Sequence, residues 1–192
     1  MSGLRSRMLG IVGAGALVIG ERIALGTALI RGGGQESGLR AGTENVPAIV
    51  GFGAAAEAVA RTGAQETARI AALRERLEKG LREIAPDTAI FGAEAPRVAN
   101  TVLFAVKGVK AETALIALDL DGVAVSSGAA CSSGKVARSH VLAAMGVPDA
   151  LAAGAIRVSL GYATSDEDIE DFLRAWRKHA EALPTRQQGI AA

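Results

Sequence analysis

Between residues 101 and 183 the chain alternates between short apolar runs and longer amphipathic segments, and this alternation restricts the possible folds more than any other feature. The apolar runs predict strands and the amphipathic segments predict helices. Strands are expected at 101–106, 122–127 and 155–161, and helices at 111–120, 139–146 and 164–183. For the last helix, Thr164 and Glu167 have the spacing of a capping box. Because strands and helices alternate, the sequence predicts an α/β or α+β domain.

A long helix is expected before this region, from about residue 46 to residue 84. Asn45 can cap its start, and Pro47 is tolerated in a first turn. The segment 61–65 is expected to weaken or kink it. Its second half carries an apolar stripe and two i,i+4 ion pairs on the solvent side. The stripe is Ile70, Leu73, Leu77, Leu81 and Ile84, and the expected pairs are Glu75–Lys79 and Glu78–Arg82.

Charge and cysteine content exclude several classes of function. Twenty-one basic residues against 20 acidic ones give a net charge of +1, and no basic patch with interleaved aromatic residues is present. Nucleic acid is therefore not expected as a partner. A single cysteine cannot form an internal disulfide, which favours a reducing, cytoplasmic location. One cysteine and two histidines cannot fill a tetrahedral zinc site unaided, so no metal is expected.

The N-terminal segment allows two interpretations. Arg5 and Arg7 precede an apolar run at 8–19, which is the outline of a secretory signal. The run is too short to cross a bilayer as a helix, so no membrane association is expected. The other interpretation is a short buried strand at 15–19.

Cys131 lies in the segment SSGAACSSGK, directly after a predicted strand. A lone free cysteine is often a small buried hydrophobic residue. Here the surrounding serines and glycines favour an exposed thiol, and nearby Lys135 and Arg138 would favour the thiolate. The residues alone leave both alternatives open. His140, nine positions further on, is expected to be a surface or packing residue.

Two further features suit the binding of an anion. The glycine-rich loop 31–45 could place backbone N–H groups and the Thr43 hydroxyl around a phosphate, although it could equally be a structural turn. Arg157 lies in the middle of a predicted strand, where a buried charge requires a partner. It either faces solvent from an edge strand or binds a carboxylate through both guanidinium nitrogens.

Three segments together resemble the cysteine desulfurases of the NifS/IscS-like group, in the class V aminotransferase family of fold type I pyridoxal-phosphate enzymes. They are RGGGQESGLRAGTENVPAIVGFGAA, VSSGAACSSGKVARSHVLAAMG and IRVSLGYATSDEDIEDFL, and the resemblance extends from about Gly15 onward. It implies the C-terminal portion of that fold. Residues 1–62 would be a remnant of the large cofactor-binding domain and the start of the linking helix, residues 63–184 the small domain, and residues 185–192 a disordered tail.

The resemblance also implies roles for individual residues. Cys131 would be the catalytic nucleophile that takes sulfur from L-cysteine, leaving alanine and a persulfide. Arg157 would bind the substrate carboxylate. Thr43 would contact the phosphate of pyridoxal phosphate in the other subunit of a homodimer. The sulfur would pass to an acceptor such as an iron–sulfur scaffold protein.

The sequence departs from the family at the position of the cofactor lysine. Counting back from Gly15, that position is occupied by Arg7, and the preceding histidine position by Ser6. Arginine cannot replace lysine in a Schiff base, because its guanidinium group stays protonated. The isolated chain is therefore expected to be inactive, needing a complementary N-terminal half. The alternatives are a non-catalytic sulfur-carrier or interaction module, and a non-functional relic.

Overall fold

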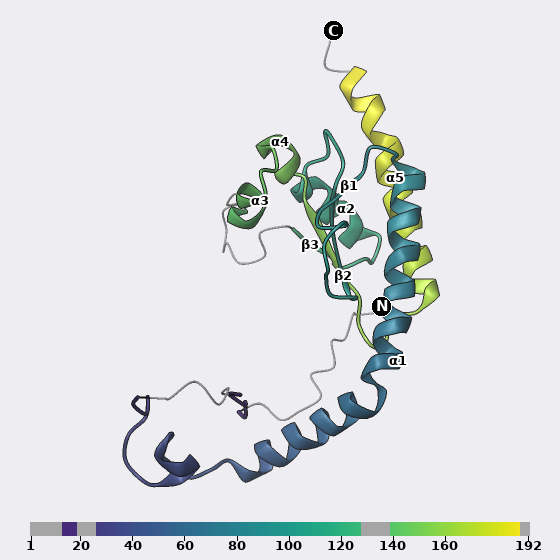
Figure 1. Ribbon diagram of the computed structural model, residues 1–192. Helices are drawn as coiled ribbons and strands as arrows, with labels where there is room; N and C mark the ends of the chain where they lie inside the picture. Colours follow the sequence, from purple (N-terminus) through teal and green to yellow (C-terminus); the bar gives the residue numbers. More distant parts are fainter. Residues whose placement is uncertain (1–12, 19–25, 128–138, 189–192) are drawn as a thin grey trace. The chain divides into compact units, whose positions relative to one another are not determined.

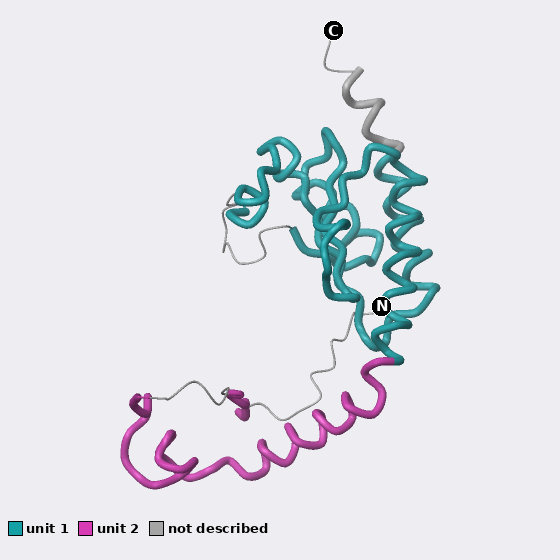
Figure 2. Tube along the Cα trace, viewed as in Figure 1, with its two compact units in different colours: residues 1–7, 65–192 teal, residues 8–64 magenta. Residues whose placement is uncertain are grey.

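The computed structural model describes residues 13–18, 26–127 and 139–188, without the side chains of 181–188 (Figure 1). The chain divides into two compact units (Figure 2). One comprises residues 8–64, and the other comprises residues 65–192 together with residues 1–7. The domain limits expected from the sequence stay a prediction.

The unit of residues 65–192 is built on a four-stranded antiparallel sheet with the order β1-β2-β4-β3. The strands are β1 (Ala89–Ile90), β2 (Thr101–Ala105), β3 (Ser126–Ser127) and β4 (Ile156–Ser159). β4 is an inner strand, between β2 and β3. It pairs with β2 from Ile156 to Ser159, but with β3 only at Ile156 and Arg157.

Most of the helices lie where the hydrophobic pattern predicts them. They are α1 (Val46–Ile84), α2 (Ala111–Leu120), α3 (His140–Ala144), α4 (Asp149–Ala152) and α5 (Asp166–Gln188), with the short 3₁₀ helix η1 (Gln35–Gly38) before α1. The Asn45 side chain caps α1 by accepting a hydrogen bond from the Ala48 N–H at 3.2 Å. Ser139 caps α3 in the same way, through the Leu142 N–H. α5 continues to Gln188, into the segment expected to be a tail.

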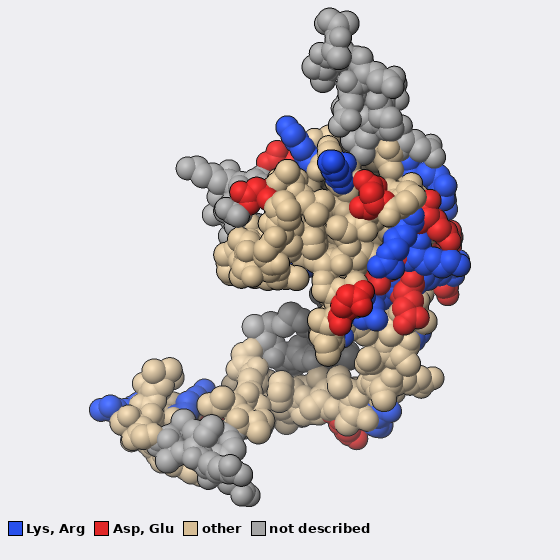
Figure 3. All heavy atoms as spheres, turned by 45° about the horizontal axis from the view of Figure 1, so that its top comes forward, with Lys and Arg blue, Asp and Glu red and all other residues tan. Residues whose placement is uncertain are grey.

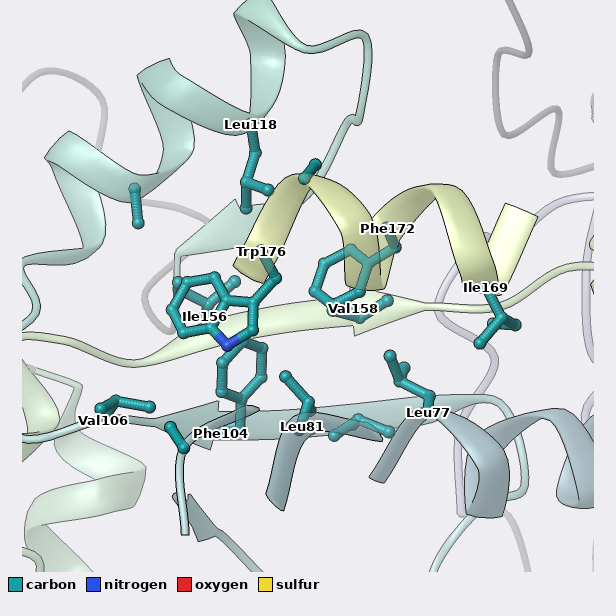
Figure 4. Packing of buried hydrophobic residues seen from close by; sticks show 14 of the residues in the cluster. Leu77, Leu81, Phe104, Val106, Leu118, Ile156, Val158, Ile169, Phe172 and Trp176 are labelled. Carbon is teal, nitrogen blue, oxygen red and sulfur yellow. The ribbon is translucent and has the colours of Figure 1, made fainter. Parts of the chain in front are cut away.

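The hydrophobic core fills one face of the sheet (Figure 4). Leu77 and Leu81 of α1 are fully buried there, which confirms the predicted stripe. The Trp176 ring of α5 packs edge-to-face on Phe104 of β2, with ring centroids 5.1 Å apart. Because β2 and β4 alternate residues between two faces, their core residues leave Arg157 on the opposite face.

α1 and α5 approach each other closely at Gly80. A Cβ atom added there would lie 2.4 Å from a methyl carbon of Leu173. The absence of a side chain at Gly80 therefore lets the two helices pack at this point.

The segment 61–65 does not end the long helix, because α1 runs from Val46 to Ile84; the predicted weakening or kink stays a prediction. Within it, the Thr62 hydroxyl donates to the Ala58 carbonyl, and Arg61 forms an i,i+4 ion pair with Glu57. A glycine in a helix costs only about 1 kcal/mol relative to alanine, so Gly63 does not end it.

The predicted buried strand at 15–19 is not observed in its described part. Residues 13–18 form no strand, and Leu17 and Val18 are 77% and 93% exposed. A strand needs a neighbouring strand for its backbone hydrogen bonds, and no other strand pairs with residues 13–18 in the described residues.

Two other boundaries differ from the prediction. The strand expected at 122–127 is reduced to Ser126–Ser127, because only these residues pair with β4. The capping box of α5 is formed one residue later than expected. Ser165 and Asp168 exchange hydrogen bonds with each other's backbone N–H groups, whereas the Thr164 hydroxyl accepts from the Gly161 N–H.

Within the described residues, no helix combines the length and the apolar character needed to cross a membrane.

Candidate functional site

Arg157 lies at the centre of the exposed face of the sheet. Its neighbours Ile156 and Val158 are buried in the core, whereas Arg157 itself is half-buried on the other face. Across the sheet it lies opposite Leu103 of β2 and Ser126 of β3. The alternative of an edge strand is therefore wrong, because β4 has a neighbour on both sides at this position.

The Arg157 guanidinium makes no hydrogen bond or ion pair with any residue in the described ranges. Other arginines of the same unit are paired, for example Arg97, which holds the Glu78 carboxylate through both terminal nitrogens at 2.6 and 2.9 Å. A free, half-buried guanidinium can bind a carboxylate bidentately, because its planar donors match the two carboxylate oxygens. The position therefore suits an anionic ligand.

Cys131, Lys135 and Arg138 lie outside the described residues. The segment that carries them begins after Ser127 of β3 and ends at Ser139, the cap of α3. Cys131 is four residues beyond Ser127, a stretch that can span at most about 14 Å. Ser126, on the strand that leads into this segment, is the cross-strand neighbour of Arg157. The reactivity of Cys131 stays a prediction.

His140 is the first residue of α3 and is exposed. Its exposure agrees with the prediction that His140 is a surface or packing residue.

The glycine-rich loop of the other unit is held by a parallel bridge between Ile30 and Arg40. Arg40 also donates from its guanidinium to the Gly42 carbonyl at 2.9 Å and to the Thr43 carbonyl at 3.4 Å. Gly42 has φ = +100°, a conformation that favours glycine. Thr43 follows it, is exposed, and makes no side-chain hydrogen bond with the described residues.

The loop residues Arg40 and Thr43 suit the phosphate group of pyridoxal phosphate. The described residues of this loop include no lysine that could bond the cofactor covalently. The Thr43 hydroxyl and the neighbouring Arg40 guanidinium are chemically suited to a phosphate. However, the sequence contains no lysine before Lys79, and Arg7 lies outside the described residues. Of the later lysines, Lys79 pairs with Glu83 and Lys178 with Asp121. No lysine of the described part therefore lies on the loop that would meet the phosphate.

Two charged clusters connect elements of the unit of residues 65–192, and the sequence did not reveal them. The Glu78 side chain, expected to pair with Arg82, is buried beside Arg97, and this carboxylate raises the pKa of Arg97. Asp121 at the end of α2 meets Lys178 and His179 of α5 at 2.7 and 3.1 Å. The hydrogen bond from Lys178 is the main reason that the pKa of Asp121 is lowered. Both clusters join residues far apart in the sequence, so no local pattern could identify them.

No group of three or more His, Cys, Asp or Glu residues that could hold a metal occurs in the described residues.

The model of the aminotransferase class V family matches residues 8–172. The chain belongs to this family. A cysteine desulfurase of Sinorhizobium fredii is 45% identical over 162 residues, which are 84% of this chain and 42% of that protein. Cysteine desulfurase NifS of Azotobacter vinelandii is 40% identical, over 76% of this chain and 36% of the relative.

A NifS-like protein of Rickettsia africae has a similar solved structure, with a TM-score of 0.68 and 38% sequence identity. The match covers 79% of this chain and 39% of that one. Another structure, titled NifS-like protein, gives a TM-score of 0.69 at 32% identity. These likenesses confirm the predicted resemblance and fold class. The chain spans about two fifths of the length of these relatives, 42% in the case of the Sinorhizobium protein.

Proposed function

We propose that this chain is the C-terminal part of a cysteine desulfurase-type protein and that it carries sulfur as a persulfide on Cys131. The observation that supports this most directly is the free Arg157 guanidinium, directly across from the strand that leads into the Cys131 segment. A carboxylate bound by Arg157 would place an amino-acid substrate within reach of the thiol. L-Cysteine has both the carboxylate and the transferable sulfur that such a site requires.

In the proposed transfer, the Cys131 thiolate attacks the sulfur of L-cysteine and forms a sulfur–sulfur bond. The carbon–sulfur bond breaks, its electron pair stays with the substrate carbon, and that carbon takes up a proton to give alanine. The products are alanine and a Cys131 persulfide, so no external oxidant or reductant is consumed. The persulfide sulfur then passes to an acceptor, for which an iron–sulfur scaffold protein is our proposal.

The family's reaction depends on pyridoxal phosphate, and we infer from Arg7 at the family's lysine position that this chain does not supply the lysine. We infer that Thr43 contributes a phosphate contact to a second subunit or to a complementary N-terminal half. The isolated chain should therefore not bond the cofactor covalently. Adding pyridoxal phosphate should give only the absorbance spectrum of the free aldehyde, and a lysine-dependent band would contradict this inference.

The experiment that tests the proposed function follows labelled sulfur. The purified chain is incubated with an active cysteine desulfurase and ³⁵S-cysteine, and label on the chain is measured under non-reducing conditions. Label on the wild type and none on Cys131→Ser is the expected result. Equal labelling of both proteins would reject Cys131 as the carrier.

A second candidate is a sulfur carrier that receives sulfur only from another protein's persulfide. It is motivated by Arg7, which stands at the family's lysine position. Arg157→Lys separates the two functions, because lysine cannot form the bidentate contact with a carboxylate. A carrier should accept sulfur equally well with either residue. Desulfuration of L-cysteine, reconstituted with a complementary N-terminal half, should fall about 10-fold or more in the variant.

A further inference from the structure

A cavity of about 220 Å³ lies within the unit of residues 65–192, between the segment 121–125, the end of β4 and the first turns of α5. Figure 4 shows Phe172 of α5 beside Val158 of β4, two of the residues that line it. Because Val158 is buried on the core face of β4, the cavity lies on the side of the sheet away from Arg157. The apolar residues of its wall are Val123, Val125, Val158, Leu160, Ile169 and Phe172.

The course of the backbone before β3 creates this space. Ser126 pairs with Arg157, and a longer strand would place Val125 opposite Val158. Pairing stops at Ser126 instead, and residues 123–125 form no strand. The valine side chains between this segment and β4 leave part of the gap unfilled.

The size of the cavity suits one small ring. An apolar cavity of about 150 Å³ lined by leucine, isoleucine and phenylalanine stays free of water and binds benzene. The cavity of this chain is larger, so it can hold a six-membered ring with a short substituent. It is smaller than the ~300 Å³ at which pockets for drug-sized molecules begin. Phe172 in the wall favours an aromatic ligand, because aromatic rings attract each other beyond the effect of buried area.

A carboxylate without a cation belongs to the same wall. Asp168 of α5 lines the cavity and is half-buried. It accepts hydrogen bonds from the N–H and the hydroxyl of Ser165, both on Oδ2, at 2.8 and 3.0 Å. Its Oδ1 accepts none from the described residues, and no cationic side chain of those ranges pairs with it. The two other aspartates of the wall, Asp121 and Asp171, are already paired with a lysine and an arginine. Asp168 is therefore the carboxylate that is available to a cationic ligand.

We propose that this cavity binds a small aromatic amine. The ring would fill the apolar space and leave water. The ammonium group, on a short alkyl chain, would bind Oδ1 of Asp168. A half-buried carboxylate attracts a cation more strongly than an exposed one does, because the surrounding dielectric constant is lower. None of these residues belongs to the proposed sulfur-transfer site, so either proposal can fail without the other.

Titration of the full-length, ¹⁵N-labelled chain with benzylamine tests the proposal by NMR. Benzylamine is protonated at neutral pH and should shift the amide signals of residues 123–125 and 158–161 in a saturable way. Benzyl alcohol has the same ring without the charge and should bind about fivefold more weakly, the upper end for an ion pair that water still reaches. The absence of a saturable shift at the cavity wall, or equal affinity for the amine and the alcohol, would overturn the proposal.

Two variants separate the role of the carboxylate from that of the cavity. Asp168→Asn keeps an acceptor oxygen for Ser165 but removes the charge, so it should weaken benzylamine binding about fivefold without changing that of benzyl alcohol. Glu167→Gln is its matched control, because Glu167 is exposed in the same turn of α5 and is not part of the cavity wall. Val123→Phe should fill the cavity and abolish binding of both ligands, whereas Ile116→Phe, at a position that is 65% exposed on α2, should not. Equal effects of Asp168→Asn and Glu167→Gln, or undiminished binding by Val123→Phe, would contradict the proposal.

Discussion

At the scale of single residues, the unit of residues 65–192 contains one buried charge with a partner, Glu78, and one half-buried charge without a partner among the described residues, Arg157. The Glu78 carboxylate is buried and held by Arg97, whereas the Arg157 guanidinium is half-buried and has no partner among the described residues. A paired charge stabilises a fold only as long as both members are present. A charge without a partner is available to a ligand. This contrast supports our proposal that Arg157 binds the substrate carboxylate.

Removing the Glu78 carboxylate should destabilise the unit of residues 65–192. Glu78→Ala leaves the Arg97 and Arg74 side chains, which are only 19% and 15% exposed, without their carboxylate. We expect a loss of about 2–3 kcal/mol in the free energy of unfolding, measured by urea denaturation. Glu83→Ala, which removes an exposed pair with Lys79, is the control and should change it by less than about 0.5 kcal/mol. Similar losses in both variants would contradict the importance of burial.

Asp121 should contribute to stability in a pH-dependent way. Its pKa is lowered in the folded chain, mainly by the hydrogen bond from Lys178. A carboxyl group with a lowered folded pKa stabilises the fold above its unfolded pKa of about 3.9, and this contribution is lost as the pH falls through the folded value. The urea midpoint of the wild type should therefore fall more steeply than that of Asp121→Asn below about pH 4. Parallel curves would show that the contact does not persist in solution.

The role of a residue could be predicted from the sequence only where it depends on neighbouring residues in the chain. The Asn45 and Ser139 caps follow from their place before an apolar segment, and the structure confirms both. The Glu78–Arg97 pair could not be anticipated, because it joins the long helix to a loop 19 positions away. The free guanidinium of Arg157 also depends on tertiary structure, since only the strand order shows that β4 is internal.

At the scale of elements, the packing of α1 against α5 determines much of the core. Four buried residues of α1 and four of α5 belong to one hydrophobic cluster: Ile70, Leu73, Leu77 and Leu81, with Ile169, Phe172, Ala175 and Trp176. Charged side chains gather over the same two helices on the molecular surface (Figure 3). Arg76 of α1, for example, binds both Asp166 and Glu170 of α5. Ion pairs between α1 and α5 thus lie at the surface beside the apolar contact of the two helices.

Gly80→Ala tests the close approach of these helices. The new methyl group would collide with Leu173, so we expect a cost of about 1 kcal/mol in the free energy of unfolding despite the better helix propensity of alanine. Gly53→Ala is the matched control, because a Cβ there meets no atom within 4 Å. This control should increase helicity by circular dichroism. Stabilisation by Gly80→Ala would contradict the close packing.

Elements were predictable where hydrophobic periodicity is strong. The stripe of α1 and the full extent of α2 follow from their 3.6-residue pattern. The strands at 15–19 and 122–127 were wrong or too long because a strand depends on a partner that the local sequence does not specify. The start of α5 was displaced by one residue because Thr164, Ser165 and Asp168 are all good capping residues.

At the scale of the whole molecule, the two units differ in their internal packing. All residues of the hydrophobic cluster lie between Ile70 and Trp176, and so belong to the unit of residues 65–192. In the other unit, large apolar side chains such as Leu29 and Val50 are 98% and 65% exposed. Exposed apolar surface of this kind is typical of contact with another chain or segment.

Limited proteolysis should therefore cleave the two units at different rates. Segments with few buried contacts open locally at low cost and are cut first. We expect trypsin to cleave at Arg31 or Arg40 before it cleaves at Arg74 or Arg76, which lie on the part of α1 that packs on the core. Leu81→Ala should remove this difference, since loss of a fully buried leucine costs about 2–5 kcal/mol. Cleavage throughout the chain at one rate would contradict the division into two units.

The central claim is that Cys131 carries sulfur, and the mass of the peptide that contains it tests this most directly. After incubation with an active cysteine desulfurase and L-cysteine, the peptide should gain the mass of one sulfur atom, and a reducing agent should remove it. Cys131→Ser should show no gain. An unmodified Cys131 peptide beside a persulfidated donor enzyme would contradict the account.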